Sequence, residues 1–301
     1  MSEELKDYVQ VTENVFTTFV TKRENRKDLR PANTTIMTCF ALLRELIFVD
    51  CGMDRKFAAK FRKDMENHFK KNTSHLILTH LHDDHYLAME VFKDVDIIAP
   101  EIGIEILKPD ILNPDEDYIQ AIADQAQLYS DDNDIANTIR NSKRFLPNIS
   151  VKEEMKIGPE GHELIIRVAG GHSEDSSYIF SPSEKVLCTG DNILSCYAQY
   201  VFNPTVIDTY KFWENLDVNH FIVGHGNAVN KDFISSVRKY FEELHSTLKE
   251  LKKQNLTIDE VINHPSLPIY FGTKLDNWVE GGKEHTKWIE FVTKVWYEKF
   301  C

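Results

Sequence analysis

Histidines and carboxylates are concentrated directly after one short apolar run of this sequence. Residues 75–78 (His-Leu-Ile-Leu) have the length and composition of a buried strand, and residues 79–85 (Thr-His-Leu-His-Asp-Asp-His) follow them. His80 and His82 are two positions apart, so in an extended backbone both side chains project to the same side. Because imidazole and carboxylate are the usual protein ligands of borderline divalent metals, this stretch predicts a metal site at a strand end.

Three later apolar runs end in the same manner. Residues 163–169, 185–189 and 220–223 have the composition of strands, and glycine follows each of them together with one potential ligand. Glycine tolerates positive φ and lets backbones approach closely, which suits loops that crowd around an ion. The potential ligands at these three strand ends are His172, Asp191 and His225.

The rest of the chain alternates between strand-like and helix-like segments. Apolar residues at helical spacing predict helices over residues 55–71, 233–251 and 284–300, and shorter helical segments over residues 86–92 and 257–262. Further strands are expected over residues 14–20, 34–43, 45–49, 95–99 and 177–180. The polar residues 101–148 form an insertion, helical in pieces, that we expect to lie over an active site.

The bulk composition limits the class of protein. The chain has 301 residues, 42% of them hydrophobic, and a formal net charge of −13. This negative charge disfavours broad contact with nucleic-acid phosphates, which requires basic surfaces. No apolar run reaches the roughly 18 residues of a membrane span, and the first residues lack the basic and apolar regions of a signal peptide. With five irregularly spaced cysteines and no C-x-x-C pair, a cytoplasmic location is expected.

The seven candidate ligands occur in an order that resembles the metallo-β-lactamase superfamily. The H-x-H-x-D-H loop is present at its four fixed positions, and the later Gly-His, Gly-Asp and Gly-His elements follow in the family's order, so that the resemblance covers roughly residues 14–228. It implies an α/β (α+β) fold, a four-layer αββα sandwich with the metals at one edge of the two sheets and added C-terminal helices. We expect a metallo-β-lactamase-like domain over residues 1–229, with the insertion around 101–148, and a helical extension over 230–301 that packs on it.

The resemblance also implies a set of metal ligands. Three imidazoles would hold one ion, two imidazoles and a carboxylate would hold a second, and one carboxylate would bridge both. These are, in that order, His80, His82 and His172; Asp84, His85 and His225; and Asp191. Two divalent ions are expected, with zinc as the expected metal and iron or manganese as alternatives. Asp50 matches the family's D-x-G position, where it either orients a ligand or caps a turn.

The activity that this resemblance implies is hydrolysis at a dinuclear metal centre. A metal-bridging hydroxide would attack an ester-like bond (lactone, thioester or amide) of a small molecule. Asp84 is the expected catalytic residue, because it would bind one ion while hydrogen-bonding the attacking or leaving oxygen. Glyoxalase-type thioesterase and lactonase activities both stay open. A β-lactam substrate is disfavoured, because enzymes that act on it are usually exported.

Other activities of the same fold are alternatives to hydrolysis. A mononuclear non-haem iron oxidoreductase, similar to persulfide dioxygenases, would keep a histidine at the position of His82, whereas flavin-linked diiron members carry glutamate there. A phosphodiesterase or nuclease fits the ligands but not the net charge. A small-molecule substrate is the expected partner, nucleic acid and membrane are not expected, and the sequence does not indicate an oligomeric state.

Two further features bear on the substrate. Residues 173–176 (Ser-Glu-Asp-Ser) depart from the Thr-Pro-Gly-Ser that many family members have after the corresponding histidine. Glu174 and Asp175 are expected to be solvated loop charges, and repulsion of an anionic substrate is the alternative. Candidates for the aromatic lining of a pocket are Tyr200, Phe202 and Tyr270.

Overall fold

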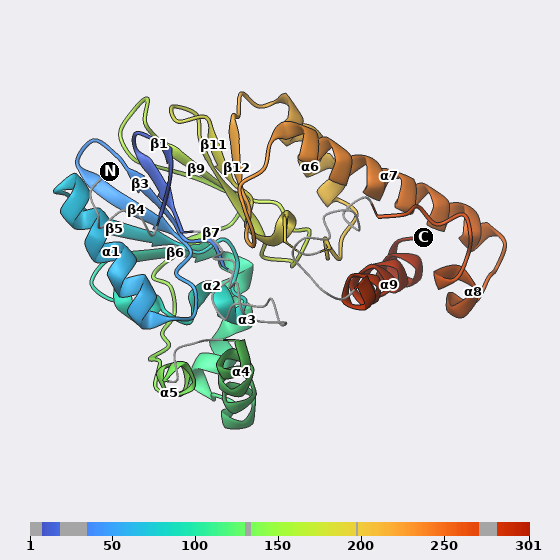
Figure 1. Ribbon diagram of the computed structural model, residues 1–301, viewed down its shortest axis with the longest axis horizontal. Coiled ribbons are helices and arrows are strands. Elements are labelled where there is room, and N and C mark those ends of the chain that lie inside the picture. The colour runs from blue at the N-terminus through green and yellow to red at the C-terminus, as the bar shows by residue number, and fades with distance from the viewer. Residues whose placement is uncertain (1–7, 19–34, 130–133, 197, 271–281) are drawn as a thin grey trace.

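Two β-sheets lie face to face between layers of helices (Figure 1). This computed structural model describes residues 8–18, 35–129, 134–196, 198–270 and 282–301. Along the first sheet the seven strands follow the order β1-β2-β3-β4-β5-β6-β7, and along the second the five strands follow the order β12-β11-β10-β9-β8. The four-layer αββα sandwich expected from the sequence is confirmed.

The first sheet changes from antiparallel to parallel pairing at its fourth strand. Its strands are β1 (Val9–Thr12), β2 (Val15–Thr17), β3 (Thr38–Ala41), β4 (Glu45–Val49), β5 (Asn72–Ile77), β6 (Asp96–Pro100) and β7 (Ile149–Val151). Strands β1 to β4 pair antiparallel, and β4 to β7 pair parallel. Parallel neighbours need a crossover, and α1 (Arg55–Phe69) supplies it between β4 and β5. The carboxyl ends of β4 and β5 therefore meet at one edge of the sheet.

The second sheet is antiparallel except for its last pair. It contains β8 (Glu154–Ile157), β9 (Leu164–Val168), β10 (Ser177–Ser181), β11 (Val186–Cys188) and β12 (His220–Ile222). Strands β11 and β12 are parallel, and α6 (Val206–Asn215) lies in the connection between them. The sequence analysis did not predict α6, β1, β7 or β8. Both β7 and β8 are short and half exposed, so they lack a continuous apolar run.

Side-chain alternation along the strands produces three separate hydrophobic cores. In β4, Leu46 and Phe48 pack outward against α1, whereas Ile47 and Val49 face the second sheet. In β11, Leu187 packs outward toward the helices, and its two neighbours face the first sheet. Burying one large apolar side chain contributes about 1.5–3 kcal/mol. The cores therefore hold the four layers together, one at each interface.

The C-terminal helices cover the outer face of the second sheet. The long helix α7 (Lys231–Lys253) begins after the capping residue Asn230, whose side chain accepts a hydrogen bond from the backbone of Phe233. Its buried stripe includes Ile234, Val237 and Phe241, which share one hydrophobic cluster with Phe221 of β12. Helices α8 (Ile258–Ile262) and α9 (Gly282–Phe300) join the same cluster. The division of the chain at residue 230 stays a prediction.

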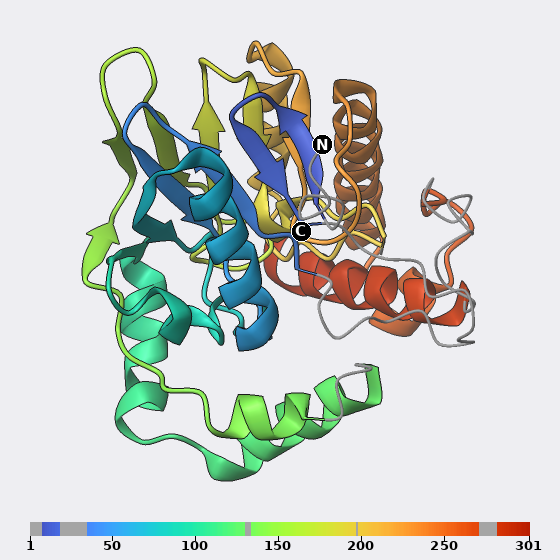
Figure 2. The ribbon, with the colours of Figure 1, turned by 60° about the vertical axis from the view of Figure 1, so that its left-hand side comes forward.

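The insertion folds into three helices that project beyond the sheets (Figures 1 and 2). They are α3 (Glu101–Leu112), α4 (Glu116–Tyr129) and α5 (Ile135–Arg140). The helix predicted over residues 86–92 is replaced by α2 (Asp83–Tyr86) and a 3-10 turn, Met89–Phe92, so helical backbone begins inside the ligand loop. Among the described residues, no helix has both the length and the apolar character needed to cross a membrane.

Candidate metal centre

The candidate ligands meet at the edge where β4 and β5 end. Asp50, directly after β4, has a positive φ of 55°, which turns its side chain toward the loop that follows β5. Its carboxylate accepts hydrogen bonds from the Thr79 amide at 2.8 Å and the Thr79 hydroxyl at 2.9 Å, and it lies 2.9 Å from His85 Nδ1. From the second sheet, the Ser177 amide donates to the Thr79 carbonyl. Asp50 therefore orients a candidate ligand, the first of the two roles considered for it.

Three imidazole nitrogens converge in the first cluster. His82 Nδ1 lies 3.1 Å from His80 Nε2 and 2.9 Å from His172 Nε2. His172 Nδ1 lies 2.9 Å from the Tyr200 carbonyl, which can only accept, so Nδ1 carries the proton and Nε2 a lone pair. The Thr79 hydroxyl donates to Asp50 and thus accepts from His80 Nδ1, which leaves His80 Nε2 unprotonated as well.

This proton count is the test of whether the cluster fits a metal. With neutral rings, at most one of the three converging nitrogens carries a hydrogen, on His82, and that hydrogen can be shared with only one neighbour. Burial, followed by the charge of His85, lowers the pKa of His80, and burial lowers the pKa of His172 to about 4. Both rings are therefore neutral at neutral pH. Three lone pairs around one point fit a divalent cation.

The second cluster combines carboxylates with two imidazoles. Asp84 Oδ2 lies 3.0 Å from His225 Nε2 and 3.7 Å from His85 Nε2, and it accepts a hydrogen bond from the Thr35 hydroxyl. His85 Nε2 and Asp191 Oδ1 are 3.2 Å apart, yet both are buried without a hydrogen-bond partner of good geometry. Buried polar atoms normally have a partner, so these two atoms also fit an ion.

Asp191 lies between the two clusters. Its Oδ2 is 3.3 Å from His225 Nε2, 3.6 Å from His172 Nε2 and 3.9 Å from His80 Nε2, while its Oδ1 faces His85. A Cβ at Gly224 would overlap Asp191 Oδ1, so only glycine leaves room for this carboxylate. The glycine expected at that strand end from the sequence is therefore required by close approach.

Charge is distributed differently in the two clusters. Burial opposes ionisation of Asp191, but the imidazoles of His225 and His85 outweigh it and hold its pKa well below the usual range. Conversely, burial opposes protonation of His225, but Asp191 and Asp84 raise its pKa to about 9. The pKa of His85 is also raised, because three carboxylates outweigh its burial. Without metal, imidazolium protons balance the carboxylates of the second cluster. A divalent cation can replace them.

The candidate ligands differ in their exposure to solvent. His80, His85, His172, Asp191 and His225 are buried. By contrast, His82 is exposed and the Asp84 side chain is 31% exposed. A substrate would therefore approach along the edge formed by these two residues. The seven sequence-predicted residues form three candidate ligand groups, His80/His82/His172, His80/His85/Asp191 and Asp84/His85/His225.

The expectation that Asp175 is a solvated charge is wrong. Asp175 is 5% exposed, and its carboxylate accepts hydrogen bonds from the Leu81 amide at 2.8 Å and the Ser173 hydroxyl at 2.7 Å. These amide and hydroxyl donors replace water around the charge, and the bond from Leu81 fixes the loop between His80 and His82. Glu174 is exposed, as expected.

The three aromatic residues considered for the pocket have different positions. The ring of Tyr200 lies 4.7 Å from the ring of His172, and the ring of Phe202 lies 5.9 Å from it. Tyr270 is instead buried against Tyr240 of α7, at 4.9 Å between rings. Two of the three aromatic candidates therefore border the centre.

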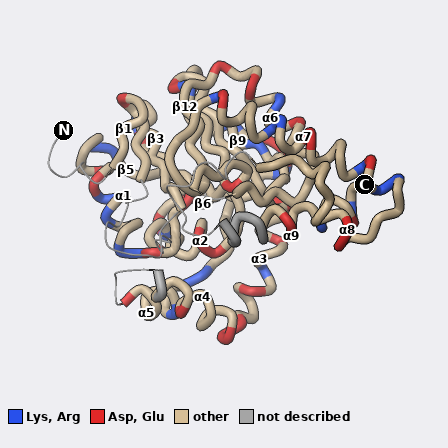
Figure 3. Tube along the Cα trace, turned by 45° about the vertical axis from the view of Figure 1, so that its right-hand side comes forward, with Lys and Arg blue, Asp and Glu red and all other residues tan. Residues whose placement is uncertain are grey.

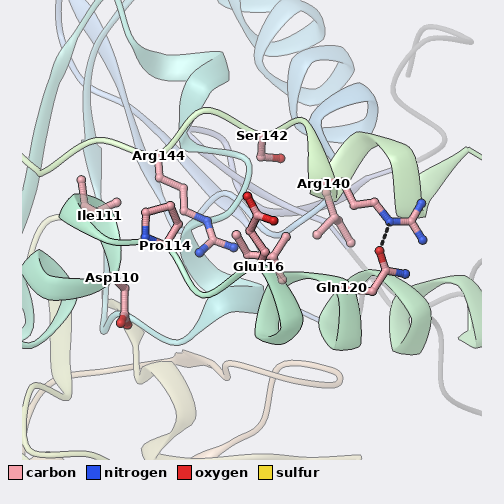
Figure 4. Close-up of a pocket in the computed structure, with 10 residues that line it drawn as sticks. Asp110, Ile111, Pro114, Glu116, Gln120, Arg140, Ser142 and Arg144 are labelled. Atoms are coloured by element: carbon pink, nitrogen blue, oxygen red, sulfur yellow. Dashed lines mark hydrogen bonds between the residues drawn. The ribbon is translucent and has the colours of Figure 1, made fainter.

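The insertion reaches the ligand loop through a tyrosine. Tyr118 of α4 donates a hydrogen bond of 2.6 Å to Asp83, which also accepts from Tyr86 at 3.1 Å. A separate cavity of about 480 Å³ lies within the insertion (Figure 4) and contains none of the candidate ligands. Its lining is Asp110, Ile111, Pro114, Glu116, Ile119, Gln120, Ile139, Arg140, Ser142 and Arg144. The role of the insertion as a lid stays a prediction.

Comparisons with known proteins agree with this architecture. The family model for the metallo-beta-lactamase superfamily matches residues 44–210, which include every candidate ligand except His225. A metallo-beta-lactamase from Pontibacter korlensis is similar in structure, with a TM-score of 0.57 and 13% identity over 78% of this chain and 98% of that one. A stereoselective inverting sec-alkylsulfatase from Pseudomonas sp. gives a TM-score of 0.64 and 15% identity over 97% of this chain and 50% of that one. No curated protein sequence matches the chain.

Proposed function

Because the chain belongs to the metallo-β-lactamase superfamily, we propose that it is a metal-dependent hydrolase of small molecules with an ester-like bond: a lactone, a thioester or an amide. The observation that carries this proposal is the convergence of three imidazole nitrogens that have at most one hydrogen between them. Such a group is stable around a cation and unfavourable without one.

The donor set is consistent with two divalent ions. The first would be held by His80 Nε2, His82 Nδ1 and His172 Nε2, and the second by Asp84, His85 and His225, with Asp191 as the carboxylate shared between them. Mixed imidazole and carboxylate donors suit zinc, with iron and manganese as alternatives. When bound, the ions would supply an activated water and stabilise the negative charge that develops on the attacked group.

Asp84 is the proposed catalytic residue. Its carboxylate lies at the exposed edge of the centre. Among the described residues, His225 and Thr35 both approach this carboxylate at Oδ2, and Thr35 donates a hydrogen bond to it. Burial opposes its ionisation, but His85 and His225 outweigh burial and lower its pKa, so the carboxylate is ionised at neutral pH. From its position at the exposed edge, we propose that Asp84 Oδ1 orients the attacking water, takes its proton and passes that proton to the leaving oxygen, nitrogen or sulfur.

Positioning residues keep the ligand nitrogens directed at the centre. Asp50 and Thr79 fix the rings of His85 and His80, and the Tyr200 carbonyl fixes that of His172. Each holds a proton on Nδ1, which leaves Nε2 facing inward when the ring is neutral. This network lowers the reorganisation needed when substrate binds.

Two alternatives from the same fold are supported less well. A single iron, as in the persulfide dioxygenase-like alternative, would need only the first cluster and would leave Asp84 and His225 without a role. A nuclease would need a basic surface, whereas Lys and Arg are interspersed with Asp and Glu along the described trace (Figure 3). The similarity to an alkylsulfatase makes a sulfate ester a reasonable addition to the substrate panel.

Substrate screening with zinc-loaded protein tests the proposal. The panel contains a lactone, a thioester, an amide, a β-lactam, a phosphodiester and an alkyl sulfate. Hydrolysis of at least one ester-like compound should fall by a factor of about 10² or more in Asp84→Asn. The exposed His162 takes no part in the centre, so His162→Ala is the matched control and should keep full activity. Turnover of none of the six compounds, or full turnover by Asp84→Asn, would contradict the proposal.

A further inference from the structure

Four aromatic side chains form a continuous surface beside the candidate metal centre. We call the set Tyr200, Phe202, Trp288 and Phe291 the aromatic shelf. Trp288 of α9 stacks on Tyr200 with 4.9 Å between ring centres, and Phe291 contacts the edge of Phe202 at 5.5 Å. Trp288 and Phe291 also contact each other at 6.4 Å. The shelf thus joins a loop of the second sheet to the last helix of the chain.

The shelf contacts a candidate ligand, His172, directly. His172 is hydrogen-bonded to the Tyr200 carbonyl, and its ring contacts the ring of Tyr200 at 4.7 Å. The Phe202 amide donates to the carbonyl of Gly171, the residue before His172. On its other side, the His172 ring lies 4.8 Å from the ring of the exposed His82. The His172 ring therefore lies between His82, at the exposed edge of the centre, and Tyr200 of the shelf.

Packing of α9 does not account for the shelf. Residues in the C-terminal half of α9 anchor the helix: Trp296 is buried and donates to the Val201 carbonyl, and Val292 is buried in the same hydrophobic cluster. Trp288 and Phe291 remain 43% and 49% exposed. Isolated exposed aromatic residues are common, but a contiguous set that adjoins a polar site marks a binding surface.

We propose that the aromatic shelf binds an uncharged aromatic or alkyl group of the substrate while the scissile bond lies at the edge formed by His82 and Asp84. This inference rests on the proposed hydrolase and narrows its substrate class to esters, thioesters or amides with a sizeable apolar group. The four shelf residues carry no formal charge, so an anionic group would lose hydration there without compensation. Stacking against Trp288 favours a planar ring, and the flat faces also accept an alkyl chain.

A matched series of esters tests the shelf on zinc-loaded protein. The acyl part is varied through acetyl, butanoyl, hexanoyl and phenylacetyl, and in a second series the alcohol part is lengthened instead. In one of the two series kcat/KM should rise about fourfold for each methylene that reaches the shelf. Trp288→Ala and Phe291→Ala should each lower kcat/KM for the phenyl compound about tenfold and change that of the acetyl or methyl compound less than about twofold.

Controls separate the shelf from folding and from metal binding. Phe300 is an exposed aromatic residue on the same helix outside the shelf, so Phe300→Ala should retain the wild-type size preference. Metal content is measured for every variant and should be unchanged. A size preference that is absent in the wild type, or that survives both Trp288→Ala and Phe291→Ala, would overturn the proposal.

A binding experiment makes the shelf testable without turnover. Acetate, hexanoate and phenylacetate are titrated into zinc-loaded protein by calorimetry, because a carboxylate held at the open edge lets its tail reach the shelf. Phenylacetate and hexanoate should bind at least about tenfold tighter than acetate in the wild type and not in Trp288→Ala. This result without hydrolysis would refute the proposed function and support the shelf. Hydrolysis together with equal affinity for acetate, hexanoate and phenylacetate would support the proposed function and refute the shelf.

Discussion

Replacing Asp50 by asparagine should weaken the second of the two proposed metal sites while leaving the fold in place. Asp50 is 2% exposed, and its carboxylate accepts hydrogen bonds from the Thr79 amide, the Thr79 hydroxyl and His85 Nδ1. The asparagine side chain would retain one acceptor oxygen for the Thr79 amide but would direct an NH₂ group at His85. The His85 ring must then accept at Nδ1 and carry its proton on Nε2, where it cannot bind metal.

The structure sets the size of this effect. Loss of a partner that orients a ligand typically costs about 10- to 100-fold in metal affinity, equivalent to about 1.4–2.7 kcal/mol. His85 contributes to the second cluster and contacts Asp50 directly, whereas in the first cluster only His80 is linked to Asp50, through the Thr79 hydroxyl. We therefore expect Asp50→Asn to bind the second zinc ion about 10- to 100-fold more weakly than wild type and to lose less affinity at the first site.

Competitive titration of zinc against a chromophoric chelator measures both affinities. Asp175→Asn is the matched control, because Asp175 is also a buried carboxylate that supports the ligand loop but hydrogen-bonds to no candidate ligand. It should lower the free energy of unfolding by about 1–3 kcal/mol and retain both ions. Two zinc ions bound to Asp50→Asn with wild-type affinity would refute the proposed orientation of His85.

Three further predictions follow from the same geometry. Because Asp191 and Asp84 raise the pKa of His225 to about 9, its proton must leave when the second ion binds, so the affinity of that site should fall about tenfold for each pH unit below 9 per proton released. Calorimetry in buffers of different ionisation enthalpy detects the released proton, and an affinity that does not change with pH would contradict this prediction. Gly224→Ala should displace Asp191 and reduce metal content below one ion per chain, measured by elemental analysis, and an unchanged content would show that the overlap is relieved elsewhere. Deleting residues 230–301 uncovers the outer face of the second sheet, so the shortened chain should lose its cooperative thermal transition; a cooperative transition would instead support an independent domain over residues 1–229.

Local spacing made most of the centre predictable from sequence. His80 and His82 are two positions apart, which places both side chains on one side of an extended backbone, and glycine before Asp191 and His225 indicates strand ends where side chains crowd together. These features are short-range, so they are present in the sequence itself. The helices over residues 55–71 and 233–251 were predicted for a similar reason, since each buries one apolar stripe.

Long-range contacts account for what the sequence did not indicate. Asp175 has an ordinary loop context, and only the fold brings the Leu81 amide to it from 94 residues away. The pairing of Tyr200 with Trp288 likewise joins segments that no periodicity relates. Short edge strands such as β8, with alternating exposed and half-exposed residues, offer little apolar signal. Helix α6 was missed although it buries Tyr210 and Trp213 and begins after Thr205, a residue type that favours helix starts.

An anomalous difference map from crystals of zinc-loaded protein, recorded at the zinc absorption edge, distinguishes a dinuclear centre from a mononuclear one. Two peaks per chain are expected. One should lie among His80 Nε2, His82 Nδ1 and His172 Nε2, and the other among Asp84, His85 and His225, with Asp191 between them. A single peak confined to the first cluster, or no peak at either cluster, would contradict the dinuclear centre.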